Sequence, residues 1–291
     1  MAIDFLHDKI RKLKNPLIVD LSITSDLIPA HLLEQEGSFD KAYFRFCREL
    51  LEALAGLVPG VRFSFDTFAL FGAEGLTALK SLLKRAEELG FYKLLDGPQI
   101  LSPWGADRAS LLLRSEEYPC DGMLISPYIG SDSIKPFVPA CKDGGKDLFV
   151  VVRSANKSAS DLQDLLAGRR QVQAAAAELV NRFGEGIFTK CGYSRMCAVS
   201  SAGAPDSLRN LRAQYKHMFL LVDGLDYPSG NMKNASLAFD RLGYGAAISA
   251  GPTVTASWKD EDGATGENYL DSAVAAVERI KKNLSRYFSI L

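Results

Sequence analysis

The sequence predicts an α/β protein built as a single (β/α)8 TIM barrel that spans residues 1–291. Short apolar runs typical of β-strands alternate with long amphipathic stretches along the chain, which is the pattern that repeated β-α-β units produce. We count eight such runs. Eight strand-and-helix units in series favour closure into a barrel, because every strand then gains two neighbours and every crossover can be right-handed.

The expected strands follow one another as Pro16–Leu21, Val61–Asp66, Tyr92–Asp96, Gly122–Ser126, Leu148–Arg153, Arg195–Ser200, His217–Asp223 and Tyr244–Ser249. The clearest helix is Phe39–Leu57, where apolar residues recur three and four positions apart after a Ser at position 38. A Ser-Ala-Ser-Asp run around Ser160 predicts the start of the helix after the fifth strand, and Pro205-Asp-Ser-Leu predicts the next start. Trp258–Gly266 is expected to be a loop.

Composition and charge exclude several classes of function. The 34 Lys and Arg residues nearly balance the 35 Asp and Glu residues, and no long basic block occurs, so we expect no nucleic-acid partner. No apolar run reaches the roughly 18 residues of a membrane span, and the start of the chain does not resemble a signal peptide. We therefore expect a cytoplasmic protein that does not bind membranes.

The cysteines and histidines point to no metal site. Five cysteines without Cys-x-x-Cys spacing indicate reduced thiols in the core rather than disulfides or a zinc site. His7, His31 and His217 are expected in the first helix, an early loop and the start of the seventh strand, away from the strand ends where barrels do chemistry. We expect neither a bound metal nor a cofactor.

Two long segments carry a resemblance to a known family. They are Cys120-Asp-Gly-Met-Leu-Ile-Ser-Pro-Tyr-Ile-Gly-Ser-Asp-Ser-Ile-Lys-Pro-Phe137 and Phe149-Val-Val-Val-Arg-Ser-Ala-Asn-Lys-Ser-Ala-Ser-Asp-Leu-Gln163. Both resemble bacterial, long-form orotidine 5′-phosphate decarboxylases, whose fifth-strand segment usually reads Arg-Thr-Ser-Asn-Pro-Gly followed by Asp-Leu-Gln. Weaker similarities follow in family order at Pro16–Ile23, Val61–Gly75, Leu94–Ala109, Leu220–Gly230 and Gly245–Pro252. The resemblance implies a homodimeric barrel with its active sites near the subunit interface.

The resemblance fails at the family's catalytic residues. The family's Asp-x-Lys-x-x-Asp at the end of the third strand corresponds here to Asp96-Gly-Pro-Gln-Ile-Leu101. Pro98 replaces the Lys that acts as proton donor, and Leu101 replaces the second Asp, which the family donates across the dimer. Arg62 stands at the position of the second-strand Lys and keeps the charge, but a guanidinium holds its proton. Asp96 and Arg62 are therefore the candidate catalytic residues, as remnants of the family's set.

Family positions that contact substrate have also changed. The first-strand Asp becomes Ser22, and the pyrimidine-binding Ser becomes Ala155. At the phosphate end, the family's Gln-Gly-Gly loop reads Pro228-Ser-Gly, and its phosphate-binding Arg becomes Pro252. Our candidate ligand-binding residues are Asp20, Ser22, Asp66, Ser126, Asn156, Asp223 and Gly230. A phosphate cradle of backbone amides near the last two strands remains open, because amide donors do not depend on the missing Arg.

Strand side chains alternate, and the resemblance gives the positions that face inward, so it implies a barrel mouth with five carboxylates and one Arg: Asp20, Asp66, Asp96, Asp223, Asp226 and Arg62. One interpretation is a site for a cationic, polyhydroxylated or metal-bearing ligand, with at least one raised pKa or a bound cation. The other is that these residues cap helices and pair with Arg62, Arg108 or Lys93. Lys93 itself lies at an odd offset from Asp96 and should face the outer helices.

Three functions stay open. The leading one is a catalytically degenerate relative of the decarboxylase, kept as a dimeric ligand-binding or regulatory protein for a small molecule such as a nucleotide or sugar phosphate. The second is a barrel enzyme of different chemistry that uses the acidic strand ends. The third is a divergent orotidylate decarboxylase of pyrimidine (UMP) biosynthesis.

Overall fold

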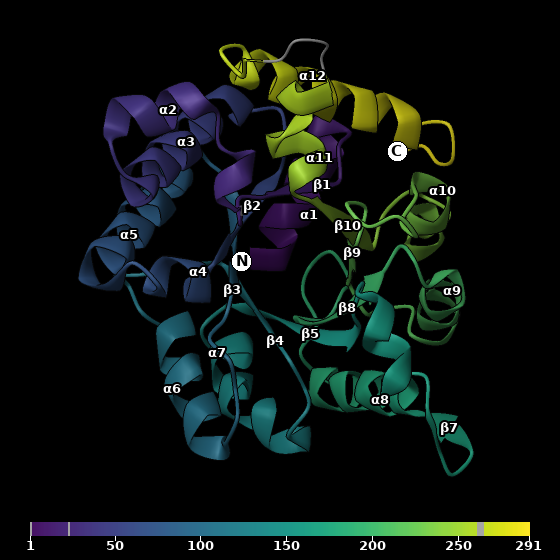
Figure 1. Cartoon of the computed structure of the whole chain (residues 1–291). Coiled ribbons are helices and arrows are strands. Elements are labelled where there is room, and N and C mark those ends of the chain that lie inside the picture. Colours follow the sequence, from purple (N-terminus) through teal and green to yellow (C-terminus); the bar gives the residue numbers. More distant parts are fainter. Residues whose placement is uncertain (1, 23, 261–264) are drawn as a thin grey trace.

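The computed structural model describes residues 2–22, 24–260 and 265–291, and the described chain forms the closed parallel barrel that the sequence predicts (Figure 1). Its strands, in order around the barrel, are β1 (Leu17–Asp20), β10 (Ala246–Ala250), β9 (Leu220–Asp223), β8 (Met196–Ser201), β5 (Asp147–Arg153), β4 (Gly122–Ile125), β3 (Tyr92–Asp96) and β2 (Gly60–Ser64). β6 (Leu166–Ala167) and β7 (Arg170–Gln171) form a separate antiparallel hairpin.

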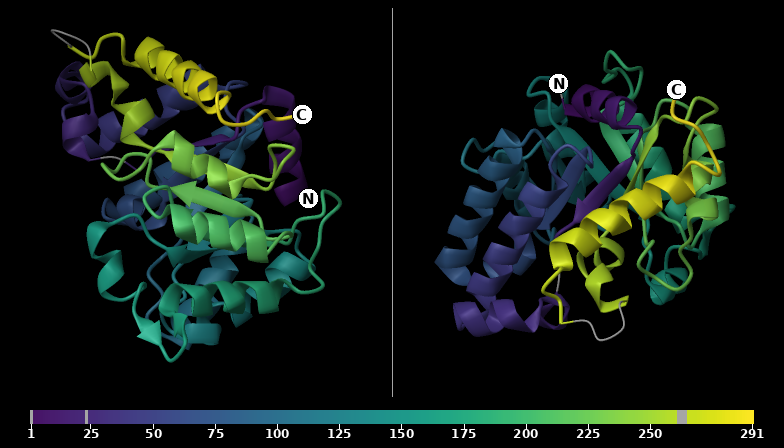
Figure 2. Two further views of the ribbon diagram at one scale, coloured as in Figure 1. Left: turned by 90° about the vertical axis from the view of Figure 1, so that its right-hand side faces the viewer. Right: turned by 90° about the horizontal axis from the view of Figure 1, so that it is seen from above.

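Helices cover the outside of the barrel in chain order (Figure 2). The long ones are α3 (Phe39–Leu54), α5 (Gly72–Glu88), α6 (Pro103–Leu113), α8 (Val172–Gly184), α9 (Pro205–Gln214) and α12 (Tyr269–Leu284). The shorter ones are α2 (Ala30–Glu36), α4 (Phe65–Ala69), α7 (Val138–Lys142), α10 (Met232–Ala235) and α11 (Pro252–Thr255). The amphipathic pattern of α3 places Phe46, Leu50 and Leu54 in the outer core between helix and strands.

The helix α1 (Ala2–Leu13) closes the amino-terminal end of the barrel, near the middle of the ring of strands in Figure 1. Ile3, Leu6 and Ile10 are buried against inward-facing strand residues such as Phe149 and Phe219. Because α1 fills this end, only the carboxyl ends of the strands are left to form a site, as in other α/β barrels.

A polar group is buried at this closed end. Asp147, at the start of β5, is fully buried and accepts a hydrogen bond of 2.9 Å from the hydroxyl of Tyr92. The guanidinium of Arg195 lies 3.3 Å from the other carboxylate oxygen of Asp147. Burial raises the pKa of Asp147 well above its usual value, and the bonds from Tyr92 and Arg195 oppose that rise.

The structure corrects several predicted elements. Asp66 lies in α4, and not at the end of a strand, because the chain turns at Ser64, whose hydroxyl accepts the amide of Thr67. After the fifth strand only a 3-10 turn, Lys157–Asp161, forms around Ser160, and the helix α8 starts later, at Val172.

The histidines and the last predicted loop also differ in part. His7 lies in α1 as predicted, His31 lies in α2 and not in a loop, and His217 precedes β9 instead of starting it. Trp258 belongs to a 3-10 turn, Ser257–Asp260, while residues 261–264 of the predicted loop lie outside the described residues. Residue 23, at the end of one family-like segment, is also outside them.

The cysteines agree with the prediction of reduced core thiols. All five are free, and Cys47, Cys120, Cys141 and Cys197 are buried while Cys191 is half-buried. Within the described residues, no helix combines the length and apolar character needed to cross a membrane.

Candidate functional site

Arg62 is the centre of the barrel mouth. In β2 the alternate residues Val61 and Phe63 pack outward into the core beneath the helices, which turns Arg62 into the barrel. The same alternation turns Asp20 and Asp223 inward at the ends of β1 and β9. Parallel strands end at one face, so these side chains meet there.

Three carboxylates surround the guanidinium of Arg62. Its Nη2 lies 2.6 Å from Asp96 Oδ2, and its Nη1 lies 3.4 Å from one carboxylate oxygen each of Asp20 and Asp223. Nη1 is also 3.4 Å from the hydroxyl of Ser249. The Arg62 side chain is only 10% exposed, so these charges interact with little solvent between them. Three negative charges against one positive charge leave the cluster acidic.

The pKa shifts agree with this arrangement. Burial alone lowers the pKa of Arg62, but the carboxylates of Asp20, Asp96 and Asp223 together raise it well above the ordinary value. Burial also raises the pKa of Asp20, against the opposing effects of Arg62 and of the Ser22 amide that donates to it over 2.9 Å. The sequence predicted at least one raised pKa among these acids, and Asp20 provides it.

Asp66 reaches the edge of this cluster from α4. Burial raises its pKa first, and the nearby charge of Asp96 raises it further, while a hydrogen bond with Gln99 opposes the shift. Asp66 forms no ion pair with a described Lys or Arg. Within the described residues, it is therefore an acidic group near the mouth that is not paired with a positive charge.

The positions of the family's proton donor hold no ionisable group near Arg62. Pro98 follows β3 in the loop to α6, and Leu101 in the same loop is 83% exposed. The nearest lysine in the sequence, Lys93, faces the outer helices as predicted: its Nζ lies 2.9 Å from Asp121 and 3.5 Å from Glu87. No described lysine pairs with the acids around Arg62.

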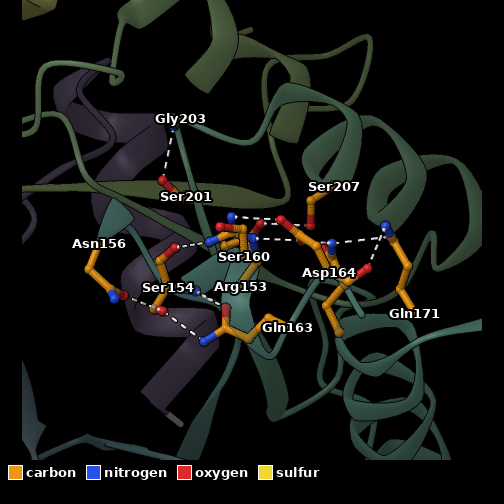
Figure 3. Close-up of polar contacts among 12 residues, drawn as sticks. Arg153, Ser154, Asn156, Ser160, Gln163, Asp164, Gln171, Ser201, Gly203 and Ser207 are labelled. Carbon is orange, nitrogen blue, oxygen red and sulfur yellow. Dashed lines mark hydrogen bonds and ion pairs between the residues drawn. The ribbon is translucent and has the colours of Figure 1, made fainter. Parts of the chain in front are cut away.

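The end of β5 forms a second polar group (Figure 3). The hydroxyl of Ser154 donates to Asn156 Oδ1 over 2.7 Å and accepts from the Gln163 amide over 2.8 Å, and the three side chains point toward one another. Between them, Ala155 packs against Gly224, where an added Cβ would lie 2.7 Å from the Ala155 Cβ. Gly224 has a φ of +87°, so both the conformation and the space favour glycine.

A feature that the sequence did not indicate lies just outside the barrel wall. Arg153 forms a bidentate pair with Asp164, at 3.0 Å for both bonds (Figure 3). Gln173 donates to the same carboxylate over 2.7 Å. A cavity of about 360 Å³ runs beside this pair between α8 and α9, lined also by Ser207 and Tyr215. The matched Asp-Leu-Gln run ends at Gln163, one residue before Asp164, so the resemblance did not include this pair.

The remaining predicted ligand residues do not join Arg62. Ser126 follows β4 and is exposed, and Asn156 belongs to the β5 group. Gly230 closes the loop after β9, where its amide donates to Tyr227 O over 2.8 Å. Asp226, from the same loop, binds two backbone amides and not Arg62. Ser22 is linked to the Arg62 group only through Asp20, which accepts its backbone amide over 2.9 Å.

Among the described residues, no group of three or more His, Cys, Asp or Glu side chains is arranged to hold a metal ion. The acids around Arg62 are arranged about a guanidinium instead. The prediction of a cation among them therefore gains no geometric support, whereas the prediction that they pair with Arg62 is confirmed for Asp20, Asp96 and Asp223.

No protein-family model matches the chain. Among curated proteins, it is 29% identical over 260 residues to an orotidine 5′-phosphate decarboxylase of Rhodopirellula baltica, with 86% of each chain covered. It is 25% identical over 288 residues to the protein of that name from Clostridium novyi, with 98% of this chain and 99% of the relative covered. The similarity extends over nearly the full length of both chains.

Solved structures agree in fold. The OMP decarboxylase of Leishmania donovani superposes with a TM-score of 0.69 at 24% identity, covering 97% of this chain and 100% of the other. The orotidine 5′-monophosphate decarboxylase of Plasmodium berghei gives a TM-score of 0.74 at 14% identity, covering 97% and 99%. At these identities the likeness concerns the barrel alone.

Proposed function

Because this chain belongs to the orotidine 5′-phosphate decarboxylase family, we propose that it is a member that no longer decarboxylates orotidylate and binds a small molecule in a regulatory role. The single observation that carries this proposal is the loss of the proton donor. Pro98 and Leu101 stand where the resemblance places a Lys and an Asp, and Lys93 faces away from the mouth. A missing general acid alone costs roughly 10²–10⁴-fold in rate.

The ion pairs that Arg62 already forms support the same proposal. A catalytic cation has to interact with a reacting group more strongly in the transition state than in the ground state. Here the guanidinium already has Asp96 at 2.6 Å and two further carboxylates at 3.4 Å. Arg62 therefore acts mainly as the counter-charge that holds the strand ends together.

The proposal includes a homodimer that forms through the carboxyl ends of the strands. Leu70, Leu101, Trp104 and Tyr128 are each more than 70% exposed, and they follow β2, β3 and β4 on that side of the barrel. Large exposed apolar side chains on neighbouring loops are typical of a protein interface. The proposal also keeps the predicted cytoplasmic location, which the five free cysteines support.

A second candidate is an enzyme of different chemistry, and Asp66 is the observation that favours it. A carboxyl group with a raised pKa that pairs with no Lys or Arg in the described part of the chain resembles a general acid. Loss of any turnover in Asp66→Asn, with ligand binding kept, would identify that role.

The test is an assay of the purified protein with orotidine 5′-phosphate, beside an intact decarboxylase of the family at the same concentration. We expect no detectable loss of substrate. Turnover within about 100-fold of the intact enzyme contradicts the proposal, because the missing donor alone should cost that much. A thermal-shift screen of nucleosides, nucleotides and sugars then finds the ligand, since a ligand at 100 times its Kd stabilises a protein by about 2.7 kcal/mol.

A further inference from the structure

A carboxylate of the protein itself occupies the backbone amides that follow the last barrel strand. Asp226 Oδ2 accepts the amide of Gly251 over 2.8 Å, and its Oδ1 accepts the amide of Thr253 over 2.7 Å. Pro252, between them, has no amide hydrogen to offer. Both oxygens of one carboxylate thus satisfy the two available donors of this turn.

The loop that carries Asp226 is compact and fixes the position of its side chain. Tyr227 donates to Gly224 O over 3.2 Å, and Gly230 donates to Tyr227 O over 2.8 Å, which folds the loop back onto the end of β9. A side chain at Gly230 would collide with Gly224, because its Cβ would lie 1.9 Å from the Gly224 oxygen. The turn is therefore compact, and Asp226 spans from it to the turn after β10.

These two turns are the ones that α/β barrels commonly use for phosphate. Phosphate sites in such barrels are frequently formed by the loops after the seventh and eighth strands and by a short extra helix. Here β9 and β10 are the seventh and eighth barrel strands, and α11 is a four-residue helix that follows directly. The amides that a phosphate oxygen would need already bind Asp226.

The surrounding charges oppose phosphate as well. Asp20 lies beside the same turn: a Cβ added at Gly251 would be 3.5 Å from the Asp20 Cβ and 3.6 Å from Asp226 Oδ2. No described Lys or Arg forms an ion pair with Asp226. A phosphate dianion that bound these amides would have to displace the carboxylate of Asp226 and would lie close to that of Asp20. Like charges at such distances repel.

We propose that Asp226 is a specificity residue that excludes phosphate-bearing ligands from the barrel mouth, so that the natural ligand is a hydroxyl-bearing molecule without a phosphate group. This inference rests on the proposed binding function. The acceptor oxygens of the acids around Arg62 suit such hydroxyl groups.

The experiment measures binding of inorganic phosphate to the full chain by calorimetry at constant ionic strength, in the parent, Asp226→Ala and Asp226→Asn. Asp226→Ala frees both amides and removes one negative charge, whereas Asp226→Asn removes the charge but keeps one acceptor oxygen for one of the two amides. We expect at least tenfold tighter phosphate binding in one or both variants than in the parent. Asp8→Ala is the matched control, since Asp8 is 66% exposed in α1, at the opposite end of the barrel.

Three results would overturn the inference: phosphate binding in the parent as tight as in the variants, no binding in either folded variant, or an equal gain in Asp8→Ala. The measurement involves no turnover. Decarboxylase activity in the parent would therefore contradict the proposed function without changing this result, and the two failures are distinguishable.

Discussion

Arg62 Nη2 donates to Asp96 Oδ2 over 2.6 Å and so joins the second strand of the barrel to the end of the third. The contact is mostly buried, since the Arg62 side chain is 10% exposed and that of Asp96 is 29% exposed. Asp20 and Asp223 lie against the same guanidinium. The stability of the mouth therefore depends on one positive charge.

Arg62→Met should reduce the free energy of unfolding by about 3–5 kcal/mol at neutral pH, because it leaves buried carboxylates without their counter-charge. Without the cation, the folded-state pKa of Asp20 rises further above its usual 3.8. A raised carboxyl pKa gives stability that is present below the unfolded pKa and lost as pH rises, so the deficit should shrink toward acid pH. Denaturant titrations of parent and variant at several pH values measure this.

The control for this variant is Arg85→Met, since Arg85 forms exposed ion pairs with Glu52 and Glu88. Exposed pairs contribute little, and we expect almost no change in stability. If both variants lost the same free energy of unfolding, the buried ion pairs of Arg62 would contribute no more to stability than the exposed pairs of Arg85.

The resemblance gave the inward direction of Arg62, and alternation along the third strand then predicted the outward direction of Lys93, because a two-residue period depends only on the local backbone. The bounds of β3 were predicted correctly for the same reason. The position of Asp66 was predicted wrongly, because the strand ends at Ser64, where the Ser64 hydroxyl accepts the amide of Thr67 and starts a helix.

Long-range contacts explain the remaining differences. The helix predicted at Ser160 is replaced by a 3-10 turn and a hairpin, and the segment between them is bound to the end of β5, because Arg153 pairs with Asp164 and Gln163 accepts the Ser154 amide. The bond from Gly251 to Asp226 joins residues 25 positions apart, which no periodicity can indicate. For the same reason, the resemblance indicated which positions would contact a substrate, but it did not indicate that Asp226 binds the amides of Gly251 and Thr253.

Asp66→Asn should stabilise the protein at neutral pH and have little effect in acid. The folded-state pKa of Asp66 is raised by burial and by Asp96, so its favourable contribution exists below pH 3.8 and is lost as pH rises through the folded value. An Asn can keep the contact with Gln99 without the charge. Asp26→Asn is the control of opposite sign, because a hydrogen bond from Thr24 lowers the pKa of Asp26. Stabilisation that persists at low pH would contradict this explanation.

Tyr92→Phe should cost about 1–3 kcal/mol of stability, because it removes a donor from the fully buried carboxylate of Asp147. Arg195 remains at 3.3 Å, so the loss should be smaller than that of Arg62→Met. Tyr287→Phe, at a side chain that is 49% exposed, should leave the midpoint of thermal unfolding unchanged. A loss no larger than that of Tyr287→Phe would show that the bond to Asp147 contributes no net stability.

Leu101→Arg should convert a dimer into a monomer without unfolding the chain. Leu101 is 83% exposed, so the monomer has no packing to lose, whereas a charge in the centre of an interface must be desolvated. Leu242→Arg is the matched control, because Leu242 is 51% exposed and precedes β10 at the other end of the barrel. Light scattering at micromolar concentration should give twice the chain mass for the parent and the control; a monomeric parent refutes the dimer.

Pro98→Lys combined with Leu101→Asp should not restore decarboxylation of orotidylate. The double variant returns a proton donor and a second carboxylate to the loop after β3, but a proton donor accelerates a reaction only when the substrate is held beside it. Ala155 and Pro252 replace residues that the resemblance assigns to pyrimidine and phosphate, and Asp226 occupies the amides of Gly251 and Thr253. Adding Asp226→Ala to the double variant should improve binding of orotidine 5′-phosphate before any turnover appears, and calorimetry beside the decarboxylation assay separates the two effects. Turnover in the double variant alone, within about 100-fold of an intact enzyme, would mean that Pro98 and Leu101 are the only barriers and that Asp226 does not restrict the mouth.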